Sequence, residues 1–173
     1  MRWLPFQLNP DLPEQGIPRE DYVARKFGQR GKGINQRVVA IGTQLGIPFA
    51  YEKMTVQPNT LNAHRLLHYA GGAGKQDAVS EELFRAHFLE GANLTDRKAL
   101  ADAAERAGLE RAGVEAYLAG DTDRDVIAKA DVEARAAGIG GVPFFIFNRK
   151  VGVSGAQEPE VLLDAMEQAT KEG

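Results

Sequence analysis

The chain has 173 residues, 21 Lys and Arg, 24 Asp and Glu, and a formal net charge of -3 at pH 7. This length suits one domain with a sizeable core. The slightly acidic balance and the absence of a basic stripe argue against nucleic-acid binding. The sequence contains no cysteine, so these residues hold no disulfide, no thiolate metal site and no thiol nucleophile.

Two further absences bear on location. The longest apolar run, Val142 to Phe147, is far short of the roughly 20 residues that a membrane helix needs. The first residues, MRWLPFQLNP, lack a basic region followed by an apolar stretch of signal-peptide length. We therefore expect a cytoplasmic protein that does not contact a membrane.

The first half of the chain begins with a predicted strand and continues with helices. Residues 1–8 predict a short strand that Pro5 confines to a sheet edge, and residues 9–18 predict a loop. A helix over 19–27 is stopped by Gly28, and a glycine-rich break at Gly31 and Gly33 follows. Helical spacing of apolar residues predicts the next helix, and Asn59 or Thr60 is expected to cap the one after it. The spaced apolar residues are Ile34, Val38, Ile41 and Leu45, followed by Ala63, Leu66, Leu67 and Ala70.

The second half is predicted to hold four more helices, a hairpin and a closing helix. The helices cover 80–90, 95–107, about 110–118 and 123–137, with Ser80, Thr95, and Asp121 or Thr122 as N-caps. Val142–Phe147 and Lys150–Ser154 predict two strands joined by a turn at Asn148 and Arg149, and a last helix covers 159–171. This order of elements predicts an α/β sandwich with a helical insertion.

Three local motifs suggest chemistry, and for each a structural role is the better interpretation. Gly71–Lys75 resembles the end of a phosphate-binding loop, but a helix precedes it instead of a strand. Ser154 lies in a sequence similar to a nucleophile elbow, yet every histidine precedes it. His64 and His68 are four residues apart on one predicted helix, and no third metal ligand is nearby. We therefore expect no metal site and no serine nucleophile.

Val142–Pro143, placed at the start of a strand in a terminal β-β-α unit, resembles the cis-proline loop of thioredoxin-fold proteins. In that fold the residue before the proline docks an extended thiol-bearing substrate through its backbone. A trans peptide bond at an edge strand is the alternative for the dipeptide alone. By this resemblance Val142 and Pro143 are the expected substrate-docking residues.

Longer blocks extend the resemblance over essentially the whole chain. RWLPFQLNPDLP, PNTLNAHRL and GIGGVPFFIFNRKVGVSGAQEPEVLLDAM resemble the DsbA-like family, and within it the FrnE-like branch. That branch is related to 2-hydroxychromene-2-carboxylate isomerases and kappa-class glutathione transferases. The resemblance implies a thioredoxin-like fold with a large helical insertion. It divides the chain into a second strand and loop (1–18), helical insertion and connecting helices (19–137), and a C-terminal β-β-α part (138–173).

The chain departs from the family where the family keeps its reactive group. Family members begin with a strand and a helix that carry Cys-x-x-Cys at the helix N-terminus, or a serine in the glutathione-using relatives. Here the strand that resembles the second one begins at residue 2, so we expect that the first β-α unit is missing. Its loss would leave backbone groups unpaired on both sides of a gap and uncover Phe144–Phe147. A second copy filling that gap is an expected partner.

The resemblance leaves three functions open. The first is a thiol-disulfide oxidoreductase or disulfide isomerase, an enzyme whose catalytic cysteines lie outside these residues and whose partner is an extended thiol-bearing peptide. The second is a glutathione-dependent isomerase or transferase, in which Val142 would bind the backbone of glutathione and Asn59, Ser154 and Gly155 its charged ends. The third is a cysteine-free binding module or an inactive fragment. No cofactor is implied by the first and third, and the chain as given cannot perform thiol exchange.

Overall fold

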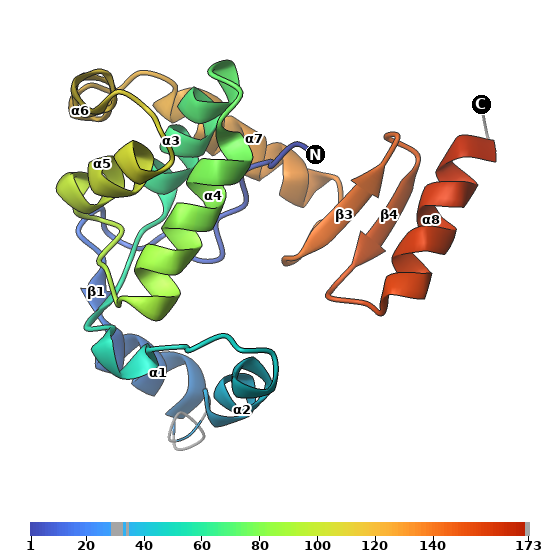
Figure 1. Ribbon diagram of the computed structural model, residues 1–173, viewed down its shortest axis with the longest axis horizontal. Helices are drawn as coiled ribbons and strands as arrows, with labels where there is room; N and C mark the ends of the chain where they lie inside the picture. The colour runs from blue at the N-terminus through green and yellow to red at the C-terminus, as the bar shows by residue number, and fades with distance from the viewer. Residues whose placement is uncertain (29–32, 34, 172–173) are drawn as a thin grey trace. The chain divides into compact units, whose positions relative to one another are not determined.

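The computed structural model describes residues 1–28, 33 and 35–171, which form two compact units, Met1–Ala128 and Lys129–Gly173. Figure 1 shows the elements coloured along the chain. The N-terminal unit contains β1 (Ile17–Pro18), α1 (Arg19–Phe27), α2 (Gln36–Gln44), β2 (Val56–Gln57), α3 (Leu61–Gly72), α4 (Gln76–Phe84), α5 (Arg97–Arg106) and α6 (Arg111–Ala119). Helix α7 (Arg124–Ala136) spans the boundary, and β3 (Phe144–Phe147), β4 (Val151–Ser154) and α8 (Pro159–Lys171) follow. A 3-10 turn covers Tyr51–Lys53, and a π-helical segment covers Arg85–Leu89.

The hydrophobic core of the N-terminal unit lies among α3, α4, α5 and α6, which pack together in Figure 1. Leu66 of α3, Leu100 of α5 and Leu118 of α6 are completely buried. Each belongs to an apolar stripe with helical spacing, which is why the sequence folds into a helical layer there. This layer corresponds to the predicted helical insertion.

The residues that cap the helix N-termini agree with the prediction for α3 and differ from it for α4 and α5. The carboxamide oxygen of Asn59 accepts a hydrogen bond from the backbone N–H of Leu61 at 2.9 Å, as expected for the start of α3. Helix α4 starts at Gln76, so the prediction that Ser80 caps it is wrong, because Ser80 is buried inside the helix. Asp96, and not Thr95, caps α5 by accepting the N–H of Lys98 at 2.8 Å. The Thr95 hydroxyl is bonded to Asn93 instead.

The prediction of a strand over residues 1–8 is wrong, because a strand requires a hydrogen-bonded neighbouring strand and the structure assigns none to these residues. Side chains hold the segment instead. The Gln76 carboxamide accepts the backbone N–H of Trp3 at 2.9 Å and donates to the Trp3 carbonyl at 3.1 Å. The indole N–H of Trp3 donates to Asp77, and the His64 ring contacts the carbonyl of Phe6 at 3.2 Å.

The predicted β-hairpin is present. Strands β3 and β4 are antiparallel, with Phe144 opposite Ser154 and Phe147 opposite Val151. This register leaves a three-residue loop, Asn148–Lys150, where a two-residue turn was predicted. Asn148 and Arg149 both have positive φ, and the Lys150 N–H closes the turn on the Phe147 carbonyl at 3.0 Å. The predicted helix residue Ile34 and the glycine break at Gly31 lie outside the described residues.

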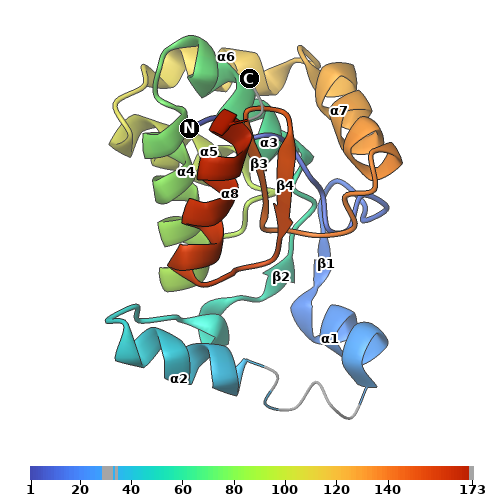
Figure 2. The same ribbon diagram turned by 90° about the vertical axis from the view of Figure 1, so that its right-hand side faces the viewer.

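Helix α8 packs on the hairpin and lies beside β4 in Figure 1, and Figure 2 shows it in front of the two strands. Only Ala165 and Ala169 of this helix are buried, while Leu163 is 58% and Met166 48% exposed. On the sheet Ile146 is 47% exposed, and no residue of β3 or β4 is fully buried. A two-stranded sheet is too small to cover the apolar side chains it shares with one helix. The described part of this unit therefore has an incomplete core.

A completely buried arginine organises the end of α6. The guanidinium of Arg65, on α3, donates to the backbone carbonyls of Thr122 at 2.9 Å, Tyr117 at 3.1 Å and Gly120 at 2.7 Å. It also donates to the carboxamide of Asn62 at 2.9 Å, and it lies 5.1 Å from the centre of the Tyr117 ring. The last carbonyls of a helix have no partner within the helix, and Arg65 supplies donors to carbonyls at and just after the end of α6.

His87 should make the stability of the chain fall under mildly acidic conditions. Burial in the π-helical segment lowers the pKa of His87 below 6.5, and the charge of Arg19 lowers it further. The folded state therefore disfavours a proton that the unfolded state binds, so stability falls as pH drops below about 6.5. Urea unfolding at pH 7.5 and 5.5 should show a smaller loss for His87→Gln than for the wild type. The matched change at an exposed ring, His68→Gln, should keep the loss, and an equal loss in His87→Gln would contradict the assignment.

Candidate substrate-docking site

The loop before β3 places Val142 and Pro143 at the start of the strand. The peptide bond between them is cis. The carbonyl of Pro143 accepts the N–H of Gly155 at 2.9 Å, which ties the loop to the residue after β4. Gly155 has a φ of +83°, a conformation that L side chains rarely adopt, so a glycine suits this position. Pro143, directly before β3, is thus fixed by Gly155, directly after β4.

Val142 is free to meet another molecule. Its side chain is 49% exposed. Within the described residues its backbone N–H and C=O form no hydrogen bond. The next residues, Phe144–Phe147, pair with β4 on one side and with no described strand on the other. An extended segment could therefore add to this edge by backbone hydrogen bonds, starting beside Val142.

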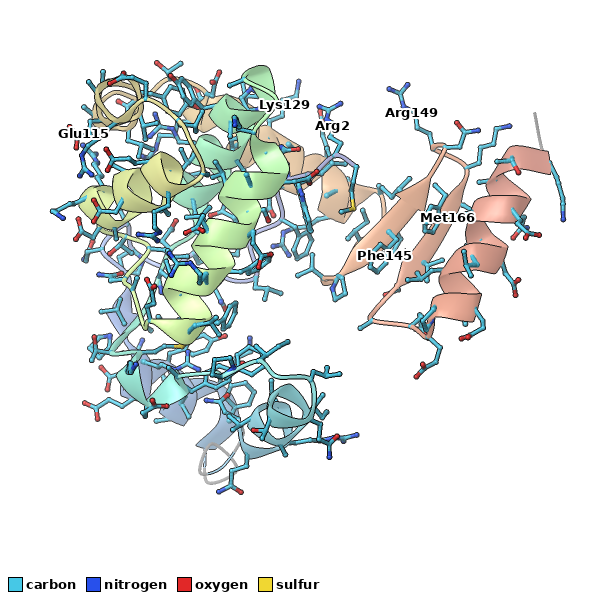
Figure 3. The ribbon with its side chains drawn as sticks, in the orientation of Figure 1. Arg2, Glu115, Lys129, Phe145, Arg149 and Met166 are labelled. Carbon is cyan, nitrogen blue, oxygen red and sulfur yellow. The ribbon has the colours of Figure 1, made fainter. Side chains whose placement is uncertain are left out.

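The side chains beside this edge are apolar. The rings of Phe145 and Phe147 lie parallel on one face of the sheet, with centroids 6.4 Å apart and an interplanar angle of 4°. Phe144 and Ile146 alternate with them on the other face, where the ring of Phe144 lies over Gly152. Phe145 and the half-exposed Met166 are labelled in Figure 3. A segment bound along β3 would meet apolar neighbours on both faces, which suits an unfolded polypeptide.

The residues predicted to bind the charged ends of glutathione have other partners in the fold. Asn59 uses its carboxamide for the N–H of Leu61 and, at 2.7 Å, for the carbonyl of Leu12. The Gly155 N–H is donated to Pro143, and the carbonyl of Ser154 accepts the side chain of Gln157 at 2.8 Å. Asn59 belongs to the N-terminal unit and Ser154 to the C-terminal unit. Glutathione binding by Asn59, Ser154 and Gly155 stays a prediction.

The histidines have local contacts. His64 faces the carbonyl of Phe6, and the ring of His68 lies 3.9 Å from the carboxylate of Asp123. Among the described residues no three His, Cys, Asp or Glu side chains gather in an arrangement that could hold a metal ion. Over the same part of the chain, none of the helices has the length and apolar character needed to cross a bilayer.

Sequence reasoning missed how the docking loop is held. The contact between the Gly155 N–H and the Pro143 carbonyl joins positions twelve residues apart by number, and only the strand register brings them together. The signal that could have indicated it is the glycine directly after the second strand, because a positive φ there turns its N–H back toward the hairpin.

Comparison with known proteins agrees with this architecture. The profile of the DSBA-like thioredoxin domain matches residues 1–167. A crystal structure of a probable DsbA oxidoreductase from Streptomyces coelicolor is similar over 97% of this chain and 74% of that chain, with 29% sequence identity and a TM-score of 0.86. The comparison with curated proteins found no match. The chain belongs to the DSBA-like thioredoxin domain family.

Proposed function

We propose that these residues form the substrate-docking part of a thiol-disulfide oxidoreductase of the FrnE-like branch, acting in the cytoplasm, with reactive cysteines supplied by sequence outside the 173 residues. The observation that carries the proposal is the outer edge of β3 next to Val142, which pairs with no strand among the described residues. An extended thiol-bearing peptide would bind there. Thiol exchange needs a thiolate, and the 173 residues contain no cysteine.

Two observations support this proposal over the alternatives. The family and the similar structure, a probable DsbA oxidoreductase, connect the fold with thiol chemistry. That neighbour is longer than the matched region, since the match covers 74% of it. A glutathione-dependent isomerase or transferase would need polar groups ready for a charged tripeptide, and the Asn59 and Gly155 groups are already engaged. A cysteine-free binding module would use the same edge without redox chemistry.

Reading the DNA upstream of the first codon, in frame, tests the proposal. A β-rich run followed by Cys-x-x-Cys, about 30 codons in all for one strand and the start of a helix, is the expected result. The extended protein should then reduce insulin, and Cys→Ser at either position should abolish that activity. A stop codon with no such run would overturn the proposal, and a lone serine at the helix start would favour the glutathione-dependent alternative.

The role of the docking loop is tested in the same extended protein. Pro143→Thr is expected to slow the release of mixed disulfides, so that the trapped complex accumulates on a non-reducing gel. Thr122→Ala, a substitution in the N-terminal unit whose backbone carbonyl and not its side chain contacts Arg65, is the control. If both variants release the substrate at the wild-type rate, Pro143 does not take part in docking.

A further inference from the structure

Helices α1 and α2 form an arm outside the core of the N-terminal unit. Helix α1 has no buried residue, and Gly42 is the one buried residue that α2 has. Figures 1 and 2 both place the two helices at the lower end of this unit, beyond α3, α4, α5 and α6. Neither helix therefore owes its place to the hydrophobic core.

The base of the arm is nevertheless well fixed. Ala50, just after the arm, donates its N–H to the Phe88 carbonyl at 2.8 Å. The rings of Phe49, Tyr51 and Phe88 form a cluster, with centroids 5.4 to 6.1 Å apart. A Cβ added to Gly42 would lie 2.5 Å from the Phe49 ring, so this glycine allows α2 to pack closely on that cluster.

On α2 an apolar stripe is left without cover. Val38 is 41%, Ile41 47% and Leu45 70% exposed. Their spacing of three and four residues puts them on one side of the helix, which is the pattern of a helix face that meets a partner. Gly42 and the half-buried Val39 account for the side that faces the cluster. The stripe is therefore on the side of α2 that does not pack against the aromatic cluster, and it is open to a partner.

Helix α2 carries no acidic residue. From Tyr22 to Tyr51 the sequence contains no Asp or Glu, although the whole chain has 24 of them. In α1 the cations Arg19, Arg25 and Lys26 accompany the acids Glu20 and Asp21. The one cation of α2 is Arg37, which is exposed in its first turn, beside the stripe. A helix face with an apolar stripe, a nearby arginine and no acidic residue attracts a partner that offers apolar side chains together with acidic ones.

We propose that the apolar stripe of α2 binds acidic, unfolded segments of the polypeptides on which the protein acts. The inference rests on the proposed function, because it names the class of client. Three apolar side chains and one nearby arginine form a small contact of low affinity. Low affinity suits a client, because the client must dissociate after the reaction. A membrane surface is the less favoured occupant, since the stripe is short and the chain as a whole carries a net charge of -3.

Fluorescence anisotropy with two labelled peptides tests this binding. The peptides have equal length and the same apolar residues, contain no cysteine, and differ in carrying Glu or Lys at the same positions. The Glu peptide is expected to bind about tenfold more tightly than the Lys peptide, with an affinity that falls as salt rises. Ile41→Ser combined with Leu45→Ser should weaken binding of the Glu peptide about tenfold. Arg37→Gln should weaken it and reduce its salt dependence.

Matched variants and a second probe decide the outcome. Ala40→Ser on the same helix, at an exposed position outside the stripe, and Arg149→Gln at the hairpin turn (Figure 3) should bind as the wild type does. Equal affinity for both peptides, or wild-type affinity in the double variant, overturns the proposal. So does binding to phosphatidylserine vesicles without binding to the Glu peptide. Because the peptides contain no thiol, this failure would leave the oxidoreductase test untouched.

Discussion

Replacing Arg65 with methionine should lower the free energy of unfolding by about 4 kcal/mol, one of the largest effects expected of a single change in this chain. Methionine fills a similar volume, so the loss comes from hydrogen bonds and not from a cavity. It leaves the carbonyls of Tyr117, Gly120 and Thr122 without the donors that the buried guanidinium supplies. Urea unfolding followed by circular dichroism measures the difference.

Two comparisons separate this explanation from a general intolerance to losing an arginine. Arg65→Lys keeps the charge but has fewer donors and no planar fork, so it should be intermediate. Arg111→Met removes a partly exposed arginine that pairs with Asp102, Glu105 and Glu115 on the surface of the same helical layer. Its effect should be much smaller, because exposed ion pairs contribute little. If both methionine variants unfold at the same urea concentration, the buried network is not what stabilises α6.

Self-association through the open edge of β3 is the second large effect. Within the described residues this strand has a neighbour on one side alone, and Ile146 on it is 47% exposed. Edges of this kind pair with another chain unless a charge prevents it. Ile146→Lys should therefore lower the apparent association constant, measured by sedimentation, about tenfold, which corresponds to about 1.4 kcal/mol.

The matched change lies on the helix of the same unit. Leu163→Lys introduces the same charge at a side chain that is 58% exposed on α8, away from the strand edge. It should associate as the wild type does. A wild-type chain that stays monomeric over the whole concentration range would contradict the prediction, and so would equal effects of the two lysines.

The sequence predicted those elements whose pattern is local. The helices around Leu66, Leu100 and Leu118 follow from apolar spacing, and the hairpin follows from two apolar runs around Asn148 and Arg149. The strand over residues 1–8 was predicted from composition, but a strand exists only with a neighbour, which no local pattern reveals. Arg65 gave no signal either, since its partners are backbone carbonyls more than 50 residues away.

At the candidate site, too, local features could be predicted from the sequence and long-range contacts could not. Val142 and Pro143 could be selected from the dipeptide and its place before a strand. The engagement of Asn59 with Leu12, 47 residues away, depends on how the chain folds back and could not be read from the sequence. The apolar stripe of α2 was visible as helical spacing, but spacing alone does not tell a core face from an exposed one.

The carboxamide of Gln76 gives the first residues of the chain a fixed register. By bonding both the N–H and the carbonyl of Trp3, it treats that residue as a neighbouring strand would. A single glutamine, itself held by the Leu67 carbonyl at 3.2 Å, thus fixes the position of Trp3 against the helices of this unit without any sheet. Gln76→Glu lacks the donor, so it would keep the bond from the Trp3 N–H and lose the bond to the Trp3 carbonyl.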